Sequence, residues 1–246
     1  MLPGSLLVKP WFEQLRVVLV RPRNPLNIGA AARAISNFGF SHLRLVTPWE
    51  PSYLGAKSAV GAAHVLETSE VFDDVASAVA DCALVVGTTA AGKRELQHRI
   101  DTLEDAAAPL HAAMQQAPVA LLFGSEKSGL SNEELAHCHW LMRIPTRDEH
   151  ISMNLGQSVA ICLYELTRGN AAPPVTTQKN AARAEDLERI AGLLLETLET
   201  SGYFSEAGEQ AAMDKLRRFV QRLELNPEDA RVLLGMMRQI LWKVRH

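Results

Sequence analysis

The sequence lacks the features of a disulfide-stabilised, zinc-ribbon or membrane-spanning protein. Its three cysteines, Cys82, Cys138 and Cys162, are odd in number and have no C-x-x-C spacing, so neither a disulfide framework nor a zinc ribbon is indicated. No apolar run approaches the roughly 18 to 20 residues that a membrane helix needs. The N-terminus shows neither a basic segment followed by an apolar run nor a cleavage site. We therefore expect a cytoplasmic protein without a membrane anchor.

Three motifs of nucleotide binding and nucleophilic catalysis are also missing. No predicted strand is followed by G-x-G-x-x-G, which argues against a Rossmann dinucleotide site. Residues 124–130 (G-S-E-K-S-G-L) have leucine where a P-loop requires lysine, and no G-x-S-x-G marks a nucleophilic serine. His137, Cys138 and His139 are consecutive, and consecutive residues rarely converge on one ion. We therefore expect no metal site.

Composition and charge indicate a globular protein rather than a general nucleic-acid binder. Hydrophobic residues make up 47% of the chain and only 15 of its 246 residues are glycine, which is consistent with a substantial core. The formal net charge is −3. Any RNA-binding surface must therefore be a local patch of positive charge.

Short apolar runs alternate with helical patterns through the first two thirds of the chain. Runs rich in branched apolar residues predict strands at residues 15–20, 43–46, 65–66, 82–86, 119–123 and 140–144. Apolar residues at helical spacing predict helices at residues 27–38, 58–63, 72–79 and 154–166. This alternation predicts an α/β domain whose parallel sheet is covered on both faces.

The composition changes abruptly after residue 168. Residues 169–178 (G-N-A-A-P-P-V-T-T-Q) are rich in proline, threonine and small residues, which is typical of a linker. Helical patterns follow at residues 184–200, 211–223 and 227–244. We therefore expect a first domain at residues 1–170, a linker at residues 171–182 and an all-helical extension at residues 183–246.

Glycine-containing or basic loops follow three of the predicted strands. Arg21 and Arg23 lie between the first strand and a helix N-terminus, a junction that favours anions. Residues 87–92 (G-T-T-A-A-G) follow another strand, where open α/β sheets bind ligands. Gly124 and Gly129 bracket a polar segment whose backbone can approach a ligand closely. These loops predict a ligand site at the strand ends.

Three motifs near these loops resemble those of SpoU-type RNA ribose methyltransferases of the SPOUT superfamily. The first is N-x-G-x-x-x-R at Asn27, Gly29 and Arg33, and the second is G-S-E-K-S-G-L at residues 124–130. The third is I-P at residues 144–145 followed by S-M-N-L at residues 152–155. The resemblance implies a SPOUT fold with a deep C-terminal trefoil knot, S-adenosylmethionine as cofactor and a homodimer.

The same resemblance implies roles for individual residues. Arg33 would be the catalytic arginine, near the ribose 2′-hydroxyl and the adjacent phosphate, and Asn154 and Ser152 would share in catalysis. Asn27 and Gly29 would support the site, and Glu126 would anchor the segment that carries the first motif. The implied cofactor-binding residues are Thr88, Thr89, Ala90, Gly124, Ile144, Ser152, Met153 and Asn154.

Arg33 poses a chemical question that the sequence leaves open. A guanidinium has a pKa above about 12 and is therefore a poor general base. We interpret Arg33 first as an electrostatic group that holds phosphate and stabilises a developing alkoxide. Direct acceptance of the proton by a deprotonated guanidinium is the alternative.

The helical extension resembles that of TrmJ-type tRNA methyltransferases. The resemblance rests on E-D-L-E-R (residues 185–189), G-Y-F (residues 202–204) and D-K-L-R-R-F (residues 214–219). It implies a tRNA 2′-O-methyltransferase acting on cytidine or uridine 32 of the anticodon loop. The expected RNA-binding residues are Arg21, Arg23, Lys215, Arg217 and Arg218. The alternatives are ribosomal RNA or another tRNA position as the substrate, or a noncatalytic RNA-binding protein with the same fold.

Overall fold

The first domain is built on a seven-stranded sheet with the strand order β3-β2-β1-β6-β4-β7-β5. The computed structural model describes residues 10–49, 58–90, 98–168, 181–203 and 209–245. All neighbouring strands in the sheet pair in parallel, which confirms the predicted α/β class. The strands are β1 (Leu15–Val20), β2 (His42–Val46), β3 (Glu70–Phe72), β4 (Leu84–Thr88), β5 (Ile100–Thr102), β6 (Val119–Phe123) and β7 (Trp140–Arg143).

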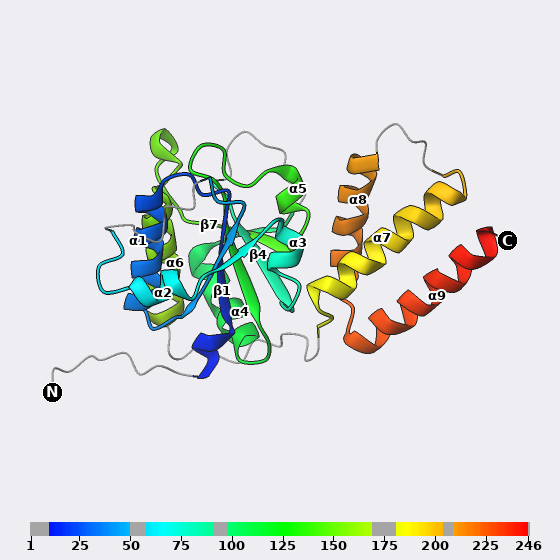
Figure 1. Cartoon of the computed structure of the whole chain (residues 1–246), viewed down its shortest axis with the longest axis horizontal. Coiled ribbons are helices and arrows are strands. Elements are labelled where there is room, and N and C mark those ends of the chain that lie inside the picture. The colour runs from blue at the N-terminus through cyan, green and yellow to red at the C-terminus, as the bar shows by residue number, and fades with distance from the viewer. Residues whose placement is uncertain (1–9, 50–57, 91–97, 169–180, 204–208, 246) are drawn as a thin grey trace.

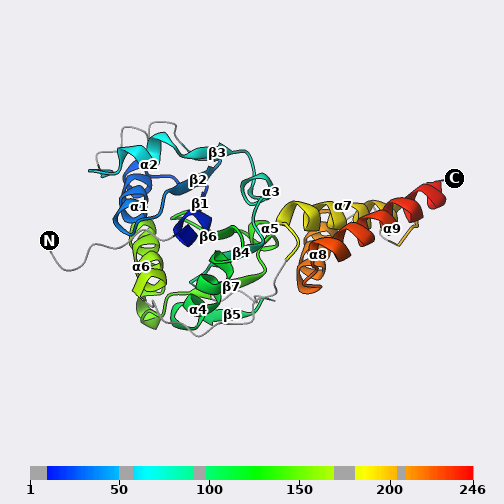
Figure 2. The same cartoon turned by 90° about the horizontal axis from the view of Figure 1, so that it is seen from below.

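The two faces of the sheet bury alternate residues of the same strands. In β1, Val17 and Leu19 belong to one core, whereas Val18 and Val20 belong to the other, because successive strand side chains point to opposite faces. The helices of the first face are α1 (Pro25–Asn37), α2 (Ala63–Glu67), α4 (Leu103–Met114) and α6 (Leu155–Arg168). Those of the second are α3 (Val75–Ala78) and α5 (Asn132–Leu135). Figure 2 shows these two sets of helices on either side of the sheet.

The C-terminal helices form a unit with a core of its own. They are α7 (Ala184–Thr200), α8 (Glu209–Arg222) and α9 (Pro227–Arg245), and their apolar side chains, such as Ile190 and Val220, pack on one another. Figure 1 shows this unit beside α3 and α5. The amide of Ala184 donates a 2.9 Å hydrogen bond to the carbonyl of Cys82, and Gln221 Nε2 donates one of 3.2 Å to the carbonyl of His137. The extension is therefore docked on the first domain.

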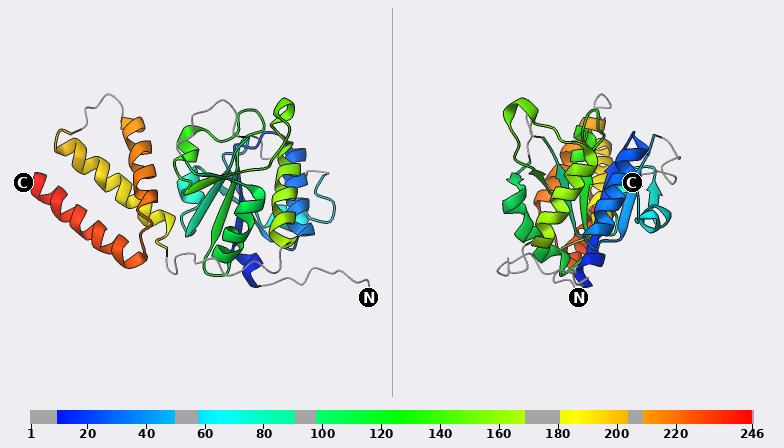
Figure 3. Two further views of the ribbon diagram at one scale, coloured as in Figure 1. Left: turned by 180° about the vertical axis from the view of Figure 1, so that it is seen from behind. Right: turned by 90° about the vertical axis from the view of Figure 1, so that its left-hand side faces the viewer.

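Helices α1 and α6 lie side by side on the part of the first domain that faces away from the extension (Figure 3). A Cβ added to Gly156 would lie 2.6 Å from the Cβ of Ala30, closer than side chains tolerate. The small residues at both positions therefore let the two helices approach closely. This approach brings the first turn of α1 next to the start of α6.

Several local predictions are wrong, and each error concerns a short segment. The segment around Val65 and Leu66 is helical rather than extended, because both side chains are buried as one side of the short helix α2. Periodicity alone does not separate a short strand from one turn of a buried helix. Residues 58–62 are not helical, and the helix predicted at residues 72–79 is reduced to α3. The sequence patterns predict neither β5 nor α4, which contains Pro109 in its interior, where proline usually disrupts a helix.

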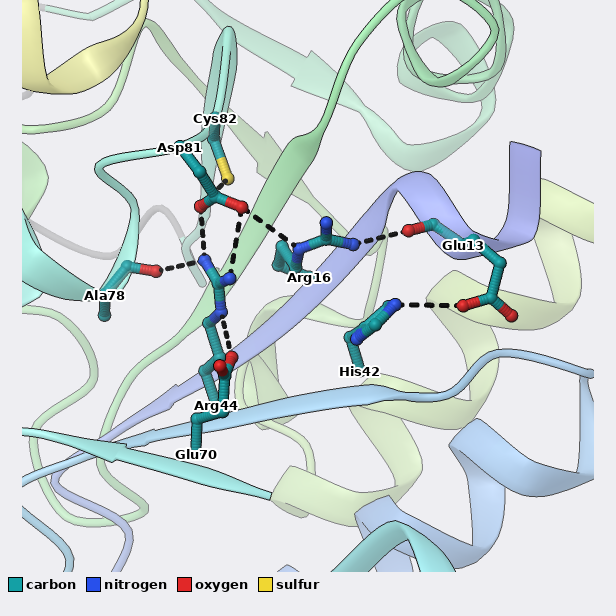
Figure 4. Close-up of polar contacts among 8 residues, drawn as sticks. All are labelled: Glu13, Arg16, His42, Arg44, Glu70, Ala78, Asp81 and Cys82. Atoms are coloured by element: carbon teal, nitrogen blue, oxygen red, sulfur yellow. Dashed lines mark hydrogen bonds and ion pairs between the residues drawn. The ribbon is translucent and has the colours of Figure 1, made fainter. Parts of the chain in front are cut away.

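An ion-pair network centred on the buried side chain of Arg44 joins β1, β2 and β3 to the turn before β4 (Figure 4). The side chain of Arg44 is only 10% exposed and donates to both carboxylate oxygens of Asp81, at 2.5 and 3.1 Å. It also donates to Glu70 and to the carbonyl of Ala78. Burial by itself would raise the pKa of Asp81, but the guanidinium groups of Arg44 and Arg16 outweigh it and lower the pKa to about 2. The network thus fixes the turn on which the extension docks.

We expect Asp81→Asn to lower the free energy of unfolding at pH 7 by about 2 kcal/mol, because the buried guanidinium of Arg44 loses a charged acceptor. Because the carboxylate of Asp81 is partly exposed, solvent screens its charge. The loss in the free energy of unfolding should therefore be smaller than for a fully buried ion pair. The pKa of Asp81 is lower in the folded chain than the usual value of about 3.9, so the carboxylate stabilises the fold above that value and stops doing so as the pH falls toward 2.

Urea denaturation at pH 7, 5 and 3 measures this difference between the wild type and Asp81→Asn. The difference in the free energy of unfolding between the two proteins should be smaller at pH 3 than at pH 7. Asp73→Asn, at an exposed aspartate of the same region, is the matched control and should change little. A gap that is absent at pH 7, or that stays constant down to pH 3, contradicts the expectation.

Candidate active site

The carboxyl ends of β4, β6 and β7 surround a cavity of about 450 Å³. This volume is typical of a small-molecule site, about 300 to 1,000 Å³. The loops after these three strands form its walls. Of the predicted cofactor-binding residues, the structure places Thr88, Thr89, Ala90, Gly124, Ile144, Ser152 and Met153 in the lining. Segments that are far apart in the sequence therefore meet at one place.

The loop after β6 depends on Gly124. A Cβ at this position would lie 2.1 Å from backbone atoms of both Gly129 and Leu130, so no other residue fits without moving the loop. The loop closes through a 2.7 Å hydrogen bond from the amide of Gly129 to the carbonyl of Ser125, and Gly129 has a φ of +66°, which favours glycine. Both glycines thus allow the loop that forms this wall of the cavity to make a tight turn.

One chain of hydrogen bonds connects the three motifs. The carboxylate of Glu126 accepts from the amides of Arg23 (2.9 Å) and Asn24 (3.1 Å) and from the side-chain amide of Asn27 (2.9 Å). The side-chain oxygen of Asn27 in turn accepts from Asn154 Nδ2 at 2.8 Å. Burial by itself would raise the pKa of Glu126, but these donors outweigh it and lower the pKa. The charged carboxylate therefore holds the first turn of α1 against the loop after β6.

Asn154 lies beside the cavity rather than in its lining. Its side-chain oxygen accepts from the amides of Gly156 (2.9 Å) and Gln157 (3.3 Å), which are free donors at the start of α6. Its amide nitrogen donates a hydrogen bond to the side-chain oxygen of Asn27. The geometry thus gives Asn154 a positioning task, while its neighbour Ser152 is exposed and faces the cavity.

The three arginines of the first motif region have different surroundings. The guanidinium of Arg21 donates hydrogen bonds of 2.6 and 2.9 Å to the carboxylate of Glu134. The guanidinium of Arg23 lies over the ring of Trp49, 4.7 Å from its centroid. Arg33 is exposed on α1, outside the lining of the cavity, and forms no hydrogen bond or ion pair within the described residues. Its guanidinium is therefore available to a substrate.

The basic residues of α8 also differ from one another. Lys215 is exposed and Arg218 is partly exposed. Arg217, however, has a side chain only 14% exposed and is paired with Glu188 (2.7 Å) and Asp214 (3.3 Å). Glu188 also lies 3.6 Å from His137 of the first domain. Arg217 therefore supports the contact between the extension and the first domain, which leaves Lys215 and Arg218 as the better candidates for RNA contact.

The sequence analysis missed several residues of the cavity. They are mostly apolar: Phe123, Leu135, Thr146 and Ile151. Phe123 and Thr146 stand next to predicted motifs and could have been found from that position. Leu135 belongs to the short helix α5, which the capping-box pattern formed by Ser131 and Glu134 could have indicated. Within the described ranges, no helix could cross a bilayer and no cluster of metal-ligating side chains occurs.

The model of the SpoU rRNA Methylase family matches residues 14–164, more than half of the chain and all three motifs. The chain belongs to the SpoU methylase family. This finding confirms the resemblance of the motifs to SpoU-type enzymes.

Two known proteins match nearly the whole chain, and a third matches about two thirds of it. The chain is 35% identical over 234 residues to the tRNA (cytidine/uridine-2′-O-)-methyltransferase TrmJ of Sodalis glossinidius, covering 93% of this chain and 91% of that protein. The crystal structure of TrmJ from Z. mobilis ZM4 is 35% identical, with a TM-score of 0.81, and covers 92% of this chain and 98% of its own. An AdoMet-bound rRNA methyltransferase from Sinorhizobium meliloti is 25% identical, with a TM-score of 0.52, over 66% of this chain and 61% of its own.

Proposed function

We propose that this chain is an S-adenosylmethionine-dependent tRNA 2′-O-ribose methyltransferase that modifies cytidine or uridine 32 of the anticodon loop. The observation that carries the proposal is a cavity lined by the second and third SpoU motifs, to which hydrogen bonds among Glu126, Asn27 and Asn154 tie the first motif. The tRNA substrate is supported by the TrmJ relative, whose similarity covers the first domain and the extension alike. A noncatalytic RNA-binding role would not need this cavity.

The residues of the cavity fit S-adenosylmethionine. Apolar side chains such as Leu130 and Ile144 suit the faces of an adenine ring, while the hydroxyl groups and backbone of Thr88 and Ser125 suit its polar edges and sugar. Lys127 supplies a cation for a carboxylate. When bound, the cofactor supplies an activated methyl group, and the chain supplies position and electrostatics.

The protein residues account for the remainder of the chemistry. A ribose 2′-hydroxyl is a poor nucleophile, and its alignment contributes much of the rate enhancement. Arg33, exposed and unpaired within the described residues, holds a substrate phosphate and stabilises negative charge that develops on the 2′-oxygen. Ser152 lines the cavity and orients the ribose. Glu126 and Asn27 keep the first turn of α1 fixed while this happens.

The proposal includes a cytoplasmic homodimer and a trefoil knot formed by the segments around β6, β7 and α6. The dimer is supported by large apolar side chains exposed on α1 and α6: Leu26, Ile161 and Tyr164. The two helices lie on the side of the first domain that faces away from the extension. A dimer that buries this side would place Arg33 of one subunit close to the partner. We also propose a domain boundary at residues 171–182, of which residues 171–180 lie outside the described part of the chain; the separate core of the extension supports it.

Incubation of tRNA transcripts and ribosomal RNA with methyl-labelled S-adenosylmethionine tests the proposal. Label on the ribose of nucleotide 32 of tRNA is the expected result. The name of the matched family favours ribosomal RNA as the second candidate substrate, and label confined to ribosomal RNA would establish it. Calorimetry adds a separate check, because a chain without measurable affinity for the cofactor would be a noncatalytic RNA-binding protein.

The double substitution Lys215→Ala with Arg218→Ala should weaken tRNA binding about tenfold and reduce the salt dependence of binding, because each lost phosphate contact removes released counterions. Affinity measured across a series of salt concentrations gives both quantities. Cofactor affinity should stay at the wild-type value. An unchanged salt slope would show that this part of α8 does not contact RNA.

A further inference from the structure

Trp49 is a large aromatic side chain that lies outside the cores formed by the described residues. It lies three residues after β2, at the same edge of the sheet as the cavity, and is 68% exposed. The guanidinium of Arg23 stacks on one face of its ring, 4.7 Å from the centroid. The amide of Trp49 donates a 3.0 Å hydrogen bond to the carbonyl of Pro22, so the two loops that carry the pair are tied together. A flat aromatic surface with a cation on one side is thus held out to solvent.

The backbone of both loops that carry the pair adopts a strained conformation. Arg21 and Thr47 each follow the last residue of a strand, β1 and β2 respectively, and both adopt positive φ angles, of 50° and 42°. This conformation is unfavourable for a β-branched residue such as threonine. The amide of Arg21 also donates a 2.8 Å hydrogen bond to the carbonyl of Val46. Strain of this kind persists where the surrounding structure demands one geometry, as at binding sites.

The pair is also connected to the wall of the cavity. Glu126 lines the cavity, and its carboxylate accepts a 2.9 Å hydrogen bond from the amide of Arg23. The guanidinium of Arg23 forms no hydrogen bond within the described residues, unlike that of Arg21, which is held by Glu134. Arg23 therefore keeps its donors free beside the site where the methyl group is transferred.

We propose that Trp49 and Arg23 form a stacking platform for an unpaired base of the RNA substrate, adjacent to the nucleotide that is methylated. The base stacks on the open face of the Trp49 ring, and Arg23 binds the neighbouring phosphate. Aromatic and guanidinium planes hold the bases of single-stranded RNA in this way, and every base presents a flat face to them. This proposal rests on the proposed function and extends it by naming residues that bind the loop of the RNA.

The test compares Trp49→Ala, Trp49→Phe and the wild type in full-length protein. Trp49→Ala should raise the Kd and the KM for tRNA roughly 5- to 150-fold, the range that corresponds to loss of one stacked base. Cofactor affinity and kcat should stay close to wild type. Trp49→Phe should recover most of the loss, because phenylalanine keeps a flat ring. Val71→Ala, at another exposed apolar side chain on the adjacent strand β3, is the matched control and should leave the Kd for tRNA unchanged.

A double-mutant cycle with Arg23→Ala tests whether the two residues act as a unit. Coupled residues give less than additive losses, since either substitution already disrupts the platform. Strictly additive losses would overturn the shared role of the pair.

The outcomes separate this inference from the proposed function. If the wild type methylates tRNA and Trp49→Ala has the same Kd and KM, the platform is refuted and the enzyme assignment stands. If the wild type binds RNA without methylating tRNA, the assignment is refuted and the Kd values alone decide the platform. A Trp49→Ala variant whose tRNA affinity is unchanged but whose mass in solution is halved would instead place Trp49 in a contact between subunits, and a wild type that binds no RNA refutes both ideas.

Discussion

Arg33→Ala should lower methyl transfer to tRNA by at least about 10²- to 10³-fold, the usual cost of removing one group that stabilises charge in a transition state. Its guanidinium is exposed on α1 and pairs with no other side chain in the described ranges, so its removal leaves no buried charge behind. It lies outside the cavity, so affinity for S-adenosylmethionine should stay at the wild-type level. Single-turnover kinetics and calorimetry measure the two quantities separately.

Two further variants sharpen the interpretation of this result. Arg33→Lys keeps the charge but loses the planar donor geometry, so it should retain only a fraction of the activity. Arg168→Ala removes an exposed arginine at the far end of α6 and should leave turnover intact. Near-normal turnover of Arg33→Ala would remove this residue from the catalytic machinery.

Gly124→Ala should reduce the affinity for S-adenosylmethionine by roughly 5- to 150-fold, since a methyl group forced into a packed site costs about 1 to 3 kcal/mol. The added Cβ would lie 2.1 Å from backbone atoms of Gly129 and Leu130, and backbone atoms have no rotamer by which to move away. The loop itself must therefore shift, and that loop forms one wall of the cavity. Calorimetric titration with the cofactor measures the change.

The matched control is Gly192→Ala, in the middle of α7. A Cβ at Gly192 would meet nothing within 4 Å, and alanine is the better helix former, so this variant should bind the cofactor normally and unfold at the same or a slightly higher temperature. Unchanged cofactor affinity in Gly124→Ala would mean that the loop after β6 does not form the binding wall.

The sequence predicted the parallel sheet because its central strands are buried on both faces. Runs such as residues 119–123 are apolar throughout, and all five residues of β6 are indeed buried. The edges of the sheet were harder to predict. β3 and β5 have three residues each and are mostly exposed or partly exposed, so neither carries a continuous apolar run. Helix α4 contains Pro109, and the packing of Leu103, Leu110 and Met114 against the sheet outweighs that local signal.

The sequence located the walls of the cavity but not the tasks of the individual side chains. Glycine-containing loops after buried strands predicted a ligand site at this edge of the sheet, and the resemblance to SpoU-type enzymes assigned residues 88–90 and Gly124 to it. All four residues line the cavity. The position of Asn154 at the start of α6, where it caps the helix, depends on a partner in α1 that no local pattern reveals. In the sequence, Arg217 cannot be distinguished from its basic neighbours. Its ion-pair partner, Glu188, lies 29 residues away along the chain. Long-range pairing of this kind decides which charges remain available to RNA.

Hydrogen bonds connect the loop after β6 to the start of α6. We therefore expect binding of the cofactor in the cavity and binding of RNA at the loop that carries Arg23 to depend on each other. A cofactor that steadies Glu126 also steadies Arg23 and Asn27, and so lowers the entropic cost of seating the RNA. Linkage requires the reverse to hold with equal strength, so the RNA must tighten the hold on the cofactor by the same factor. We therefore expect the two substrates to bind with positive cooperativity, and the two products to leave in a coupled way.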